Sequence, residues 1–289
     1  MGKIKVITDS ASDIPKELEE KYGIDIISFT VVLGDREYVS RVDFDNVSFY
    51  GMMEEYPDDV PMTSQVTAYH FMEEYYRYYQ EGYTDLIMVL INSRGSATYN
   101  NSLMAIDLLY EEHPECKDVI RIHSFDSASY CCGYGHTVLE AGKMLQEGAD
   151  VETICTYIEE ALKKRRVYFA IYNLEYAGRS GRIPGAAAFI GDKLGIKPIM
   201  KIWDHAISMA AKCRGEKKVA ARIAKQVLAE MKEGSDYQIV YGKDPAVGRE
   251  MADLITEKLG YGPTEEYVIG PEVAANAGPK VVGVSFDVD

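Results

Sequence analysis

Basic side chains are scarce in this sequence of 289 residues. Lys and Arg number 31 against 46 Asp and Glu, and the formal net charge is −15. Nucleic acids and anionic membranes both bind basic faces, so the deficit argues against either as a partner of the whole surface. Long apolar runs are also missing: none approaches the ~18 residues that a membrane-spanning helix needs. We therefore expect no nucleic-acid partner and no stable membrane insertion.

The cysteine patterns of metal and redox sites are missing as well. Five cysteines are present, an odd number, and no two have Cys-x-x-Cys spacing. His, Asp and Glu residues do not pair at the spacing of metal ligands either. We therefore expect no metal and no cofactor. No signal peptide is visible, so the thiols are expected to stay reduced, which predicts a cytoplasmic protein.

Glycine-rich phosphate loops are the third absence. The chain has a buried strand pattern over 84–91, a polar stretch over 92–96, and a helical pattern that opens within reach of Ser96. Such a turn is typical of an anion site, because the first N–H groups of a helix lack partners and carry the positive end of its dipole. It has hydroxyls where dinucleotide sites and P-loops have glycine. This pattern favours one small anion, such as a carboxylate.

A second hydroxyl-rich turn, Thr63-Ser64-Gln65, precedes another predicted helix. A buried carboxylate is costly unless its lone pairs are filled. Two or three hydroxyls with helix amides can fill them without a buried cation, which suits an amphiphile whose other end is apolar. The plain alternative is that both turns only cap helices and form bends.

The order of predicted elements indicates an α/β fold. Three strands end in Asp- or Ser-rich turns that open helices, at Asp9–Asp13, 92–96 and 126–129. In a mostly parallel open sheet these turns lie at one edge, where such sheets bind ligands. A second α/β unit follows, with a basic turn over 178–182 and a helix over 186–194. We predict an N-terminal α/β domain over 1–160 and a C-terminal α/β domain over 161–289.

An enzyme is the main alternative. A hydrolase or phosphotransferase could use the Asp9/Ser10 turn with His123 or His136. No Gly-x-Ser-x-Gly elbow is present, and histidines inside helical or strand patterns more often serve as packing or hydrogen-bond partners. A third possibility is a signalling or scaffold protein whose bound amphiphile is only structural.

The motifs, in their order, resemble those of the DegV family of bacterial fatty-acid-binding proteins. They are Val6-Ile-Thr-Asp-Ser10-Ala-Ser-Asp-Ile-Pro15, Thr63-Ser64-Gln65, Ser96-Ala97-Thr98-Tyr99, Asp126-Ser127 with Gly133 and Gly135, Leu174-Glu-Tyr-Ala with Gly181-Arg182-Ile183, Leu194-Gly-Ile-Lys197-Pro198-Ile199, and Gly278-Pro279. They span the whole chain. The resemblance implies a two-domain α/β protein with one long-chain fatty acid in a tunnel between the domains.

The same resemblance implies roles for individual residues. The carboxylate would be held by Thr63 and Ser96, with help from Ser64, and Arg182 would lie near the tunnel mouth. Such proteins are carriers without catalytic residues, similar to the fatty-acid-binding subunit of fatty acid kinase. They present the acyl chain to a separate ATP-dependent kinase that phosphorylates the carboxylate.

The chain departs from the family pattern at three positions. Asn276 stands where a histidine is expected near the head group, Ala97 replaces a glycine and Val66 replaces a proline. Asparagine can donate a hydrogen bond but carries no charge at any pH. Asn276 is therefore assigned to the ligand site as a neutral substitute.

Overall fold

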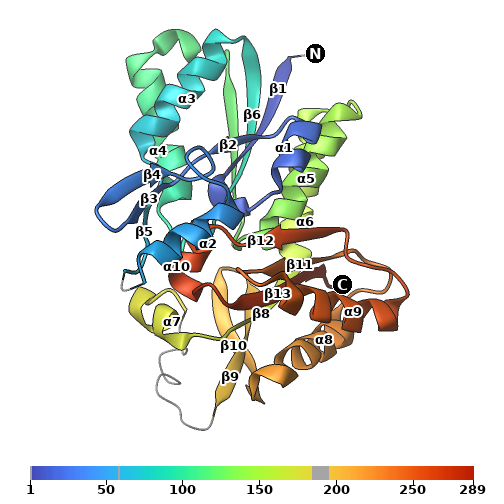
Figure 1. Ribbon diagram of the computed structural model, residues 1–289. Coiled ribbons are helices and arrows are strands. Elements are labelled where there is room, and N and C mark those ends of the chain that lie inside the picture. Colours follow the sequence, from blue (N-terminus) through green and yellow to red (C-terminus); the bar gives the residue numbers. More distant parts are fainter. Residues whose placement is uncertain (1, 58, 184–194) are drawn as a thin grey trace.

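The structure is a computed structural model that describes residues 2–57, 59–183 and 195–289 (Figure 1). The first part of the chain forms β1 (Lys3–Asp9), η1 (Ser10–Ser12), α1 (Lys16–Tyr22), β2 (Asp25–Ile27), β3 (Thr30–Leu33), β4 (Arg36–Val39), α2 (Asn46–Glu55), β5 (Met62–Ser64), α3 (Ala68–Gln80), β6 (Tyr83–Leu90), α4 (Thr98–Glu112), η2 (Pro114–Cys116), β7 (Arg121–Asp126), α5 (Cys132–Gln146) and α6 (Val151–Lys164). The remainder forms β8 (Arg165–Ile171), α7 (Leu174–Ser180), β9 (Ile196–Trp203), β10 (Ala206–Arg214), η4 (Glu216–Lys218), α8 (Val219–Glu230), β11 (Tyr237–Tyr241), α9 (Pro245–Leu259), β12 (Glu265–Val268), α10 (Pro271–Ala277) and β13 (Val281–Asp287).

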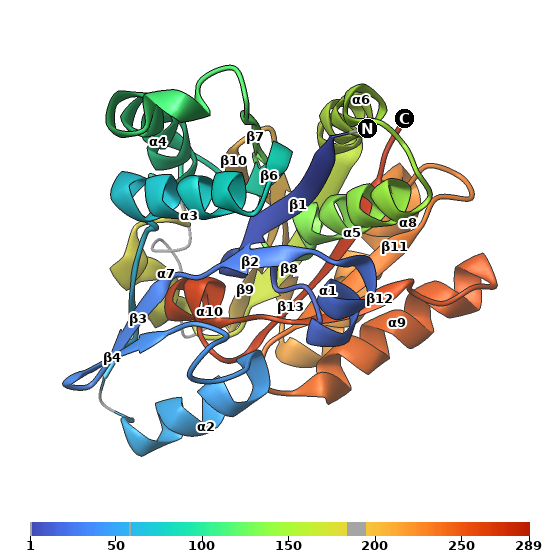
Figure 2. The same ribbon diagram turned by 90° about the horizontal axis from the view of Figure 1, so that it is seen from above.

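The N-terminal sheet is parallel throughout, in the order β2-β1-β6-β7. Six consecutive residues of β6, from Asp85 to Leu90, are buried, as expected of a strand covered on both faces. Figure 2 shows α3 and α4 on one side of β1 and β6, and α1, α5 and α6 on the other. The predicted open parallel sheet is therefore confirmed.

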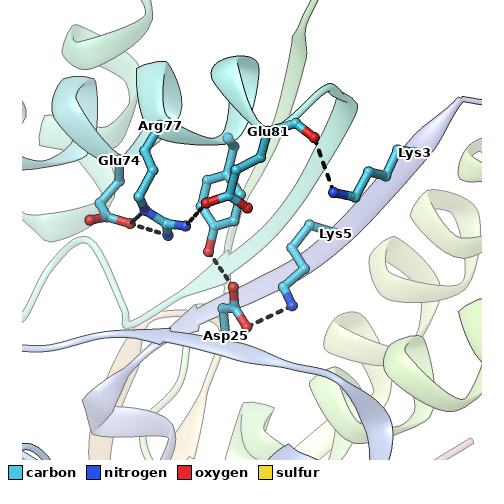
Figure 3. A network of polar contacts seen from close by, with 7 residues as sticks. Lys3, Lys5, Asp25, Glu74, Arg77 and Glu81 are labelled. Carbon is cyan, nitrogen blue, oxygen red and sulfur yellow. Dashed lines mark hydrogen bonds and ion pairs between the residues drawn. The ribbon is translucent and has the colours of Figure 1, made fainter.

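A polar network attaches α3 to this sheet (Figure 3). The Tyr78 hydroxyl on α3 donates to Asp25 Oδ2 at 2.6 Å, and Lys5 Nζ lies 2.6 Å from Asp25 Oδ1. Lys3 Nζ donates to the backbone carbonyl of Glu81 at 3.1 Å. These contacts join the C-terminal end of α3 to β1 and β2. They help to fix the helix that follows the Thr63-Ser64-Gln65 segment.

A small antiparallel sheet, in the order β4-β3-β5, carries this segment. Gly34, with φ of 63°, forms the turn between β3 and β4, so the left-handed conformation falls on a residue without a side chain. Thr63 of β5 pairs with Val31 of β3. The register of this pair decides which β5 side chains face inward.

The C-terminal unit is a larger sheet in the order β10-β9-β8-β13-β11-β12. Its pairs are antiparallel except for β11 and β12. Helices α8 and α9 cover one face (Figure 1). Ile223 and Met251 of these helices are fully buried. Its other face belongs to the same core as the N-terminal sheet, because Val167 and Phe169 share one hydrophobic cluster with Ile87.

Three predictions for the C-terminal part of the chain have different outcomes. The basic turn predicted over 178–182 is wrong in its first half, because α7 continues to Ser180 and ends at Gly181, whose φ is 66°. Asn173 accepts a hydrogen bond from Glu175 N and so starts this helix. The helix predicted over 186–194 lies outside the described residues. The domain boundary near residue 160 stays a prediction; α6 ends at Lys164 and β8 follows directly.

Candidate ligand-binding site

Three polar turns meet at the carboxyl edge of the parallel sheet, as the sequence predicted. Backbone N–H groups of two turns bond to neighbouring segments: Ser127 N donates to the Leu90 carbonyl at 2.9 Å, and Asn92 N to the Ser129 carbonyl at 3.1 Å. Ile91 N donates to Asp9 Oδ2 at 2.7 Å, which ties in the third turn. The edge is therefore a single hydrogen-bonded unit.

The turn between β6 and α4 is held by Asn92, which is fully buried. Its backbone carbonyl accepts from Gly95 N at 2.9 Å and from Ser96 N at 3.1 Å, and its side-chain oxygen accepts from Arg94 N at 3.0 Å. Three bonds from one residue fix the backbone on which Ser96 stands. The backbone that carries the Ser96 hydroxyl is thus held in place by the fold itself.

Ser96 lies at the start of α4 and contacts Thr98. Their hydroxyl oxygens are 2.9 Å apart, and Thr98 N donates to Ser96 Oγ at 3.3 Å. The residue at the helix N-cap is Ala97, whose side chain cannot cap the helix. Thr98 Oγ1 also accepts from Val66 N at 3.3 Å, which joins α4 to the chain after β5. These contacts bring the two hydroxyl turns together.

Thr63 and Ser96 both line one cavity, whose space free of protein atoms is about 880 Å³, counting the part open to solvent. Its apolar lining comes from both units of the chain: Phe29, Ile91, Val167, Phe169, Ile183, Ile202, Ile207, Val240, Ile269, Val273 and Val281. Its polar lining includes Gln65, Tyr130, Arg182, Glu272 and Asn276. The cavity therefore has hydroxyl and amide groups together with a largely apolar wall.

Arg182 and Asn276 form one rim of this cavity. Arg182 Nε donates to the Gly95 carbonyl at 3.1 Å, and Arg182 Nη1 donates to Asn276 Oδ1 at 3.3 Å. Asn276 Nδ2 in turn donates to the Glu272 carbonyl within α10 at 2.8 Å. Arg182 is exposed, so this rim meets solvent. The arginine bridges the Ser96 turn and α10.

Ser64 is placed differently from the other predicted residues. It is exposed and is not among the described residues that line the cavity. Successive side chains of a strand point to opposite faces, so Thr63 and Ser64 of β5 diverge. Gln65, the third residue of the motif, lines the cavity.

Glu272 on α10 was missed by the sequence analysis. It lines the cavity and is 5% exposed, and burial raises the pKa of its carboxyl group. Ser10 Oγ donates to its Oε1 at 2.6 Å. The available signal was the one acidic residue of a mostly apolar helix, Pro271–Ala277, but its partner Ser10 stands 262 positions earlier in the chain.

The Asp9/Ser10 turn considered for catalysis is buried. Asp9 Oδ1 accepts from the Tyr134 hydroxyl at 2.6 Å and from Ala11 N at 3.0 Å, and burial raises the pKa of Asp9 to about 7. Ser10 Oγ accepts from Phe29 N at 3.0 Å while it donates to Glu272. Both side chains act in joining segments of the fold.

The two candidate histidines bind other partners. His123 Nε2 lies 3.0 Å from Asp85 Oδ1, and His136 Nδ1 lies 2.9 Å from Glu265 Oε2. Within residues 2–57, 59–183 and 195–289, no group of three or more His, Cys, Asp or Glu could hold a metal ion. The same part of the chain contains no helix with the length and apolarity needed to cross a membrane.

Known proteins resemble this chain in sequence and in fold. A model of the DegV family matches residues 3–289. A DegV domain-containing protein of Clostridium perfringens is 31% identical over 291 residues, covering 98% of each chain. A fatty-acid-binding DegV family protein from Thermus thermophilus is 26% identical with a TM-score of 0.84, over 99% of this chain and 100% of its own.

Two further structures extend the likeness. A DegV lipid-binding protein from Thermotoga maritima is 26% identical with a TM-score of 0.82, over 99% of this chain and 98% of its own. A stearic-acid-binding protein from Eubacterium ventriosum, 24% identical with a TM-score of 0.86 over 98% of this chain and 97% of its own, has the same fold. The predicted fold class is confirmed by these likenesses.

Proposed function

The chain belongs to the DegV family, and from this premise we propose that it binds one long-chain fatty acid in the cavity that both units of the chain line. The carrying observation is the composition of the cavity wall, which has hydroxyls from Thr63 and Ser96 and an apolar lining from both units. An amphiphile with one charged end satisfies both parts of this wall.

The apolar lining supplies most of the affinity. Burying one CH₂ group contributes about 0.8 kcal/mol, so eight methylenes contribute at most about 6 kcal/mol. Phe169, Ile202 and Val281 come from three different strands of the large sheet and lie along the wall. The binding energy therefore grows with chain length as long as the cavity has room.

We propose that the carboxylate of the ligand binds at the start of α4. Ser96 can donate its O–H to a ligand oxygen while its lone pairs still serve Thr98, and Thr63 supplies a second hydroxyl. Asn276 and Arg182 line the same cavity and support a carboxylate from the rim. Hydrogen bonds to a charged group are worth about 1.5–3 kcal/mol each. Ser64, on the other face of β5, is left out of this arrangement.

We assign the protein as a carrier, without a catalytic role for its own residues, that presents the carboxylate to an ATP-dependent fatty acid kinase. The exposed Arg182 beside the site supports such docking, because a partner reaching the carboxylate would meet this side chain. All five cysteines are free, which fits the reducing cytoplasm. The test is to mix a fatty acid kinase with the fatty acid. If acyl phosphate forms only when both this protein and ATP are present, the proposed partnership with the kinase is supported.

The binding function is tested by native mass spectrometry on delipidated protein mixed with single ligands. One hexadecanoic acid should be retained per chain. Its methyl ester should be retained more weakly, because it lacks the charge that the hydroxyls recognise, and octanoic acid more weakly still, because it lacks half of the apolar chain. A protein that retains none of the three would refute the proposed function.

A further inference from the structure

The hairpin between β9 and β10 reaches from the C-terminal unit to the carboxyl edge of the parallel sheet. Trp203 pairs with Ala206, so two residues, Asp204 and His205, form its turn. Their φ angles are 46° and 64°, which places both in the left-handed region. Two-residue hairpin turns of this kind favour glycine at the second position, because a side chain is strained there. The turn thus carries an imidazole ring where glycine would fit with less strain.

His205 makes three hydrogen bonds to the polar turns at this edge of the sheet. Its backbone N donates to the Ala128 carbonyl at 3.2 Å, and its backbone carbonyl accepts from Asn92 Nδ2 at 3.0 Å. Its ring atom Nδ1 lies 3.0 Å from Asn92 Oδ1. The hairpin therefore contacts two of the three polar turns, and two of the three hydrogen bonds fall on Asn92.

The direction of the ring hydrogen bond follows from the other partners of Asn92. Its side-chain oxygen accepts from Arg94 N at 3.0 Å, and its side-chain nitrogen donates to the His205 carbonyl, so the amide can face only one way. An amide oxygen only accepts, so His205 Nδ1 carries a proton and donates it. Asn92 Oδ1 is thus held from two sides, by its own turn and by the hairpin of the other unit.

We propose that His205 is a positioning residue for the carboxylate of the ligand and that it acts through Asn92. The Asn92 carbonyl accepts from Gly95 N and Ser96 N, so the residue that His205 holds is also the one that fixes the backbone under the Ser96 hydroxyl. His205 is not among the described residues that line the cavity. This inference rests on the proposed fatty-acid-binding function and adds a residue to the same site.

The same hairpin forms part of the apolar wall of the cavity. Ile202 of β9 and Ile207 of β10 stand on either side of the turn, and both line the cavity. The hairpin that encloses the acyl chain is therefore attached directly to the turn that carries Ser96. Through His205, the apolar wall from one unit is held in a fixed place relative to the head-group turn of the other.

Three single variants of the hairpin turn test the proposal. His205→Gly suits the left-handed backbone but removes the donor to Asn92. His205→Asn keeps a donor, because its Nδ2, like the ring Nδ1, is bonded to Cγ, and asparagine tolerates the left-handed region. Asp204→Gly is the matched control, because it makes the same backbone change at an exposed residue that lines a different pocket.

We expect the dissociation constant for hexadecanoic acid to rise about 2- to 10-fold in His205→Gly, the range that one hydrogen bond allows. In His205→Asn and Asp204→Gly it should stay within about twofold of the unchanged protein. Melting temperatures should change little, because glycine relieves the turn where it removes a side chain. Isothermal titration calorimetry and thermal unfolding of the delipidated proteins measure the two quantities.

A double-mutant cycle separates positioning from plain structural support. If His205 acts through the Ser96 turn, His205→Gly should cost little further affinity in a Ser96→Ala background, whereas independent effects would add. Additive losses, or equal affinity of His205→Gly and the unchanged protein, would overturn this inference while fatty-acid binding stands. Failure of the unchanged protein to bind hexadecanoic acid would instead refute the proposed function, so the two failures are distinguishable.

Discussion

Replacing Ser96 by alanine tests where the carboxylate binds. Ser96 Oγ stands 2.9 Å from Thr98 Oγ1, on a turn that Asn92 fixes by three hydrogen bonds. The substitution removes one donor to a charged group, worth about 1.5–3 kcal/mol. We expect the dissociation constant for hexadecanoic acid to rise about 10- to 150-fold.

A second substitution extends the test. Thr63→Val keeps the shape of the side chain and removes the other hydroxyl of the cavity wall. The double variant Ser96→Ala/Thr63→Val should bind at least a hundredfold more weakly. The two effects need not add, because both hydroxyls serve one ligand group. Melting temperatures should fall little, since both residues are only half-buried.

The chain supplies its own control. Ser64 is adjacent to Thr63 but exposed and outside the cavity lining, so Ser64→Ala should leave affinity unchanged. Isothermal titration calorimetry with hexadecanoic acid gives the dissociation constants under one condition. The delipidated proteins compared are the unchanged protein, Ser96→Ala, Ser96→Ala/Thr63→Val and Ser64→Ala. If Ser96→Ala and Ser64→Ala bind with equal affinity, the carboxylate is held elsewhere and the assignment fails.

Two further predictions concern stability and access. Burial raises the pKa of Asp9 in the folded state from 3.8 to about 7, so the folded state holds this proton more tightly than the unfolded state. The free energy of unfolding should therefore fall as pH rises from about 4 to 7, by on the order of 4 kcal/mol. Urea unfolding at several pH values should show a weaker dependence on pH for Asp9→Asn, and an unchanged dependence would contradict this role of Asp9. A Cβ at Gly95 would lie 2.2 Å from the Tyr130 hydroxyl oxygen. Gly95→Ala should therefore displace the Tyr130 ring into the cavity and slow fatty-acid uptake, as measured by stopped-flow fluorescence. Uptake at the original rate would show that the ring moves away from the ligand path.

The edge of the parallel sheet was predictable because its cause is local. The predicted strand patterns ended at Thr8, Ile91 and Phe125, each followed by polar residues, and parallel pairing then placed all three strand ends together. Thr67 caps α3 for a similarly local reason, because its side chain accepts a hydrogen bond from His70 N at 3.2 Å. Such features depend on the order of residues within one short segment.

The sequence does not predict which side chains of Thr63-Ser64-Gln65 face the cavity. Which of two adjacent hydroxyls faces the cavity depends on the pairing of Thr63 with Val31, and a slip by one residue would exchange them. Glu272 escaped prediction for a related reason. Its burial depends on Ser10, far away in sequence, and no property of α10 alone reports that contact.

The position of β13 in the large sheet has a consequence for synthesis. This last strand pairs with β8 on one side and β11 on the other, and Val281 at its start lines the cavity. A nascent chain that has not yet released β13 from the ribosome lacks the centre of that sheet. Closing the cavity therefore requires β13, and chains truncated before Val281 should lack part of its wall.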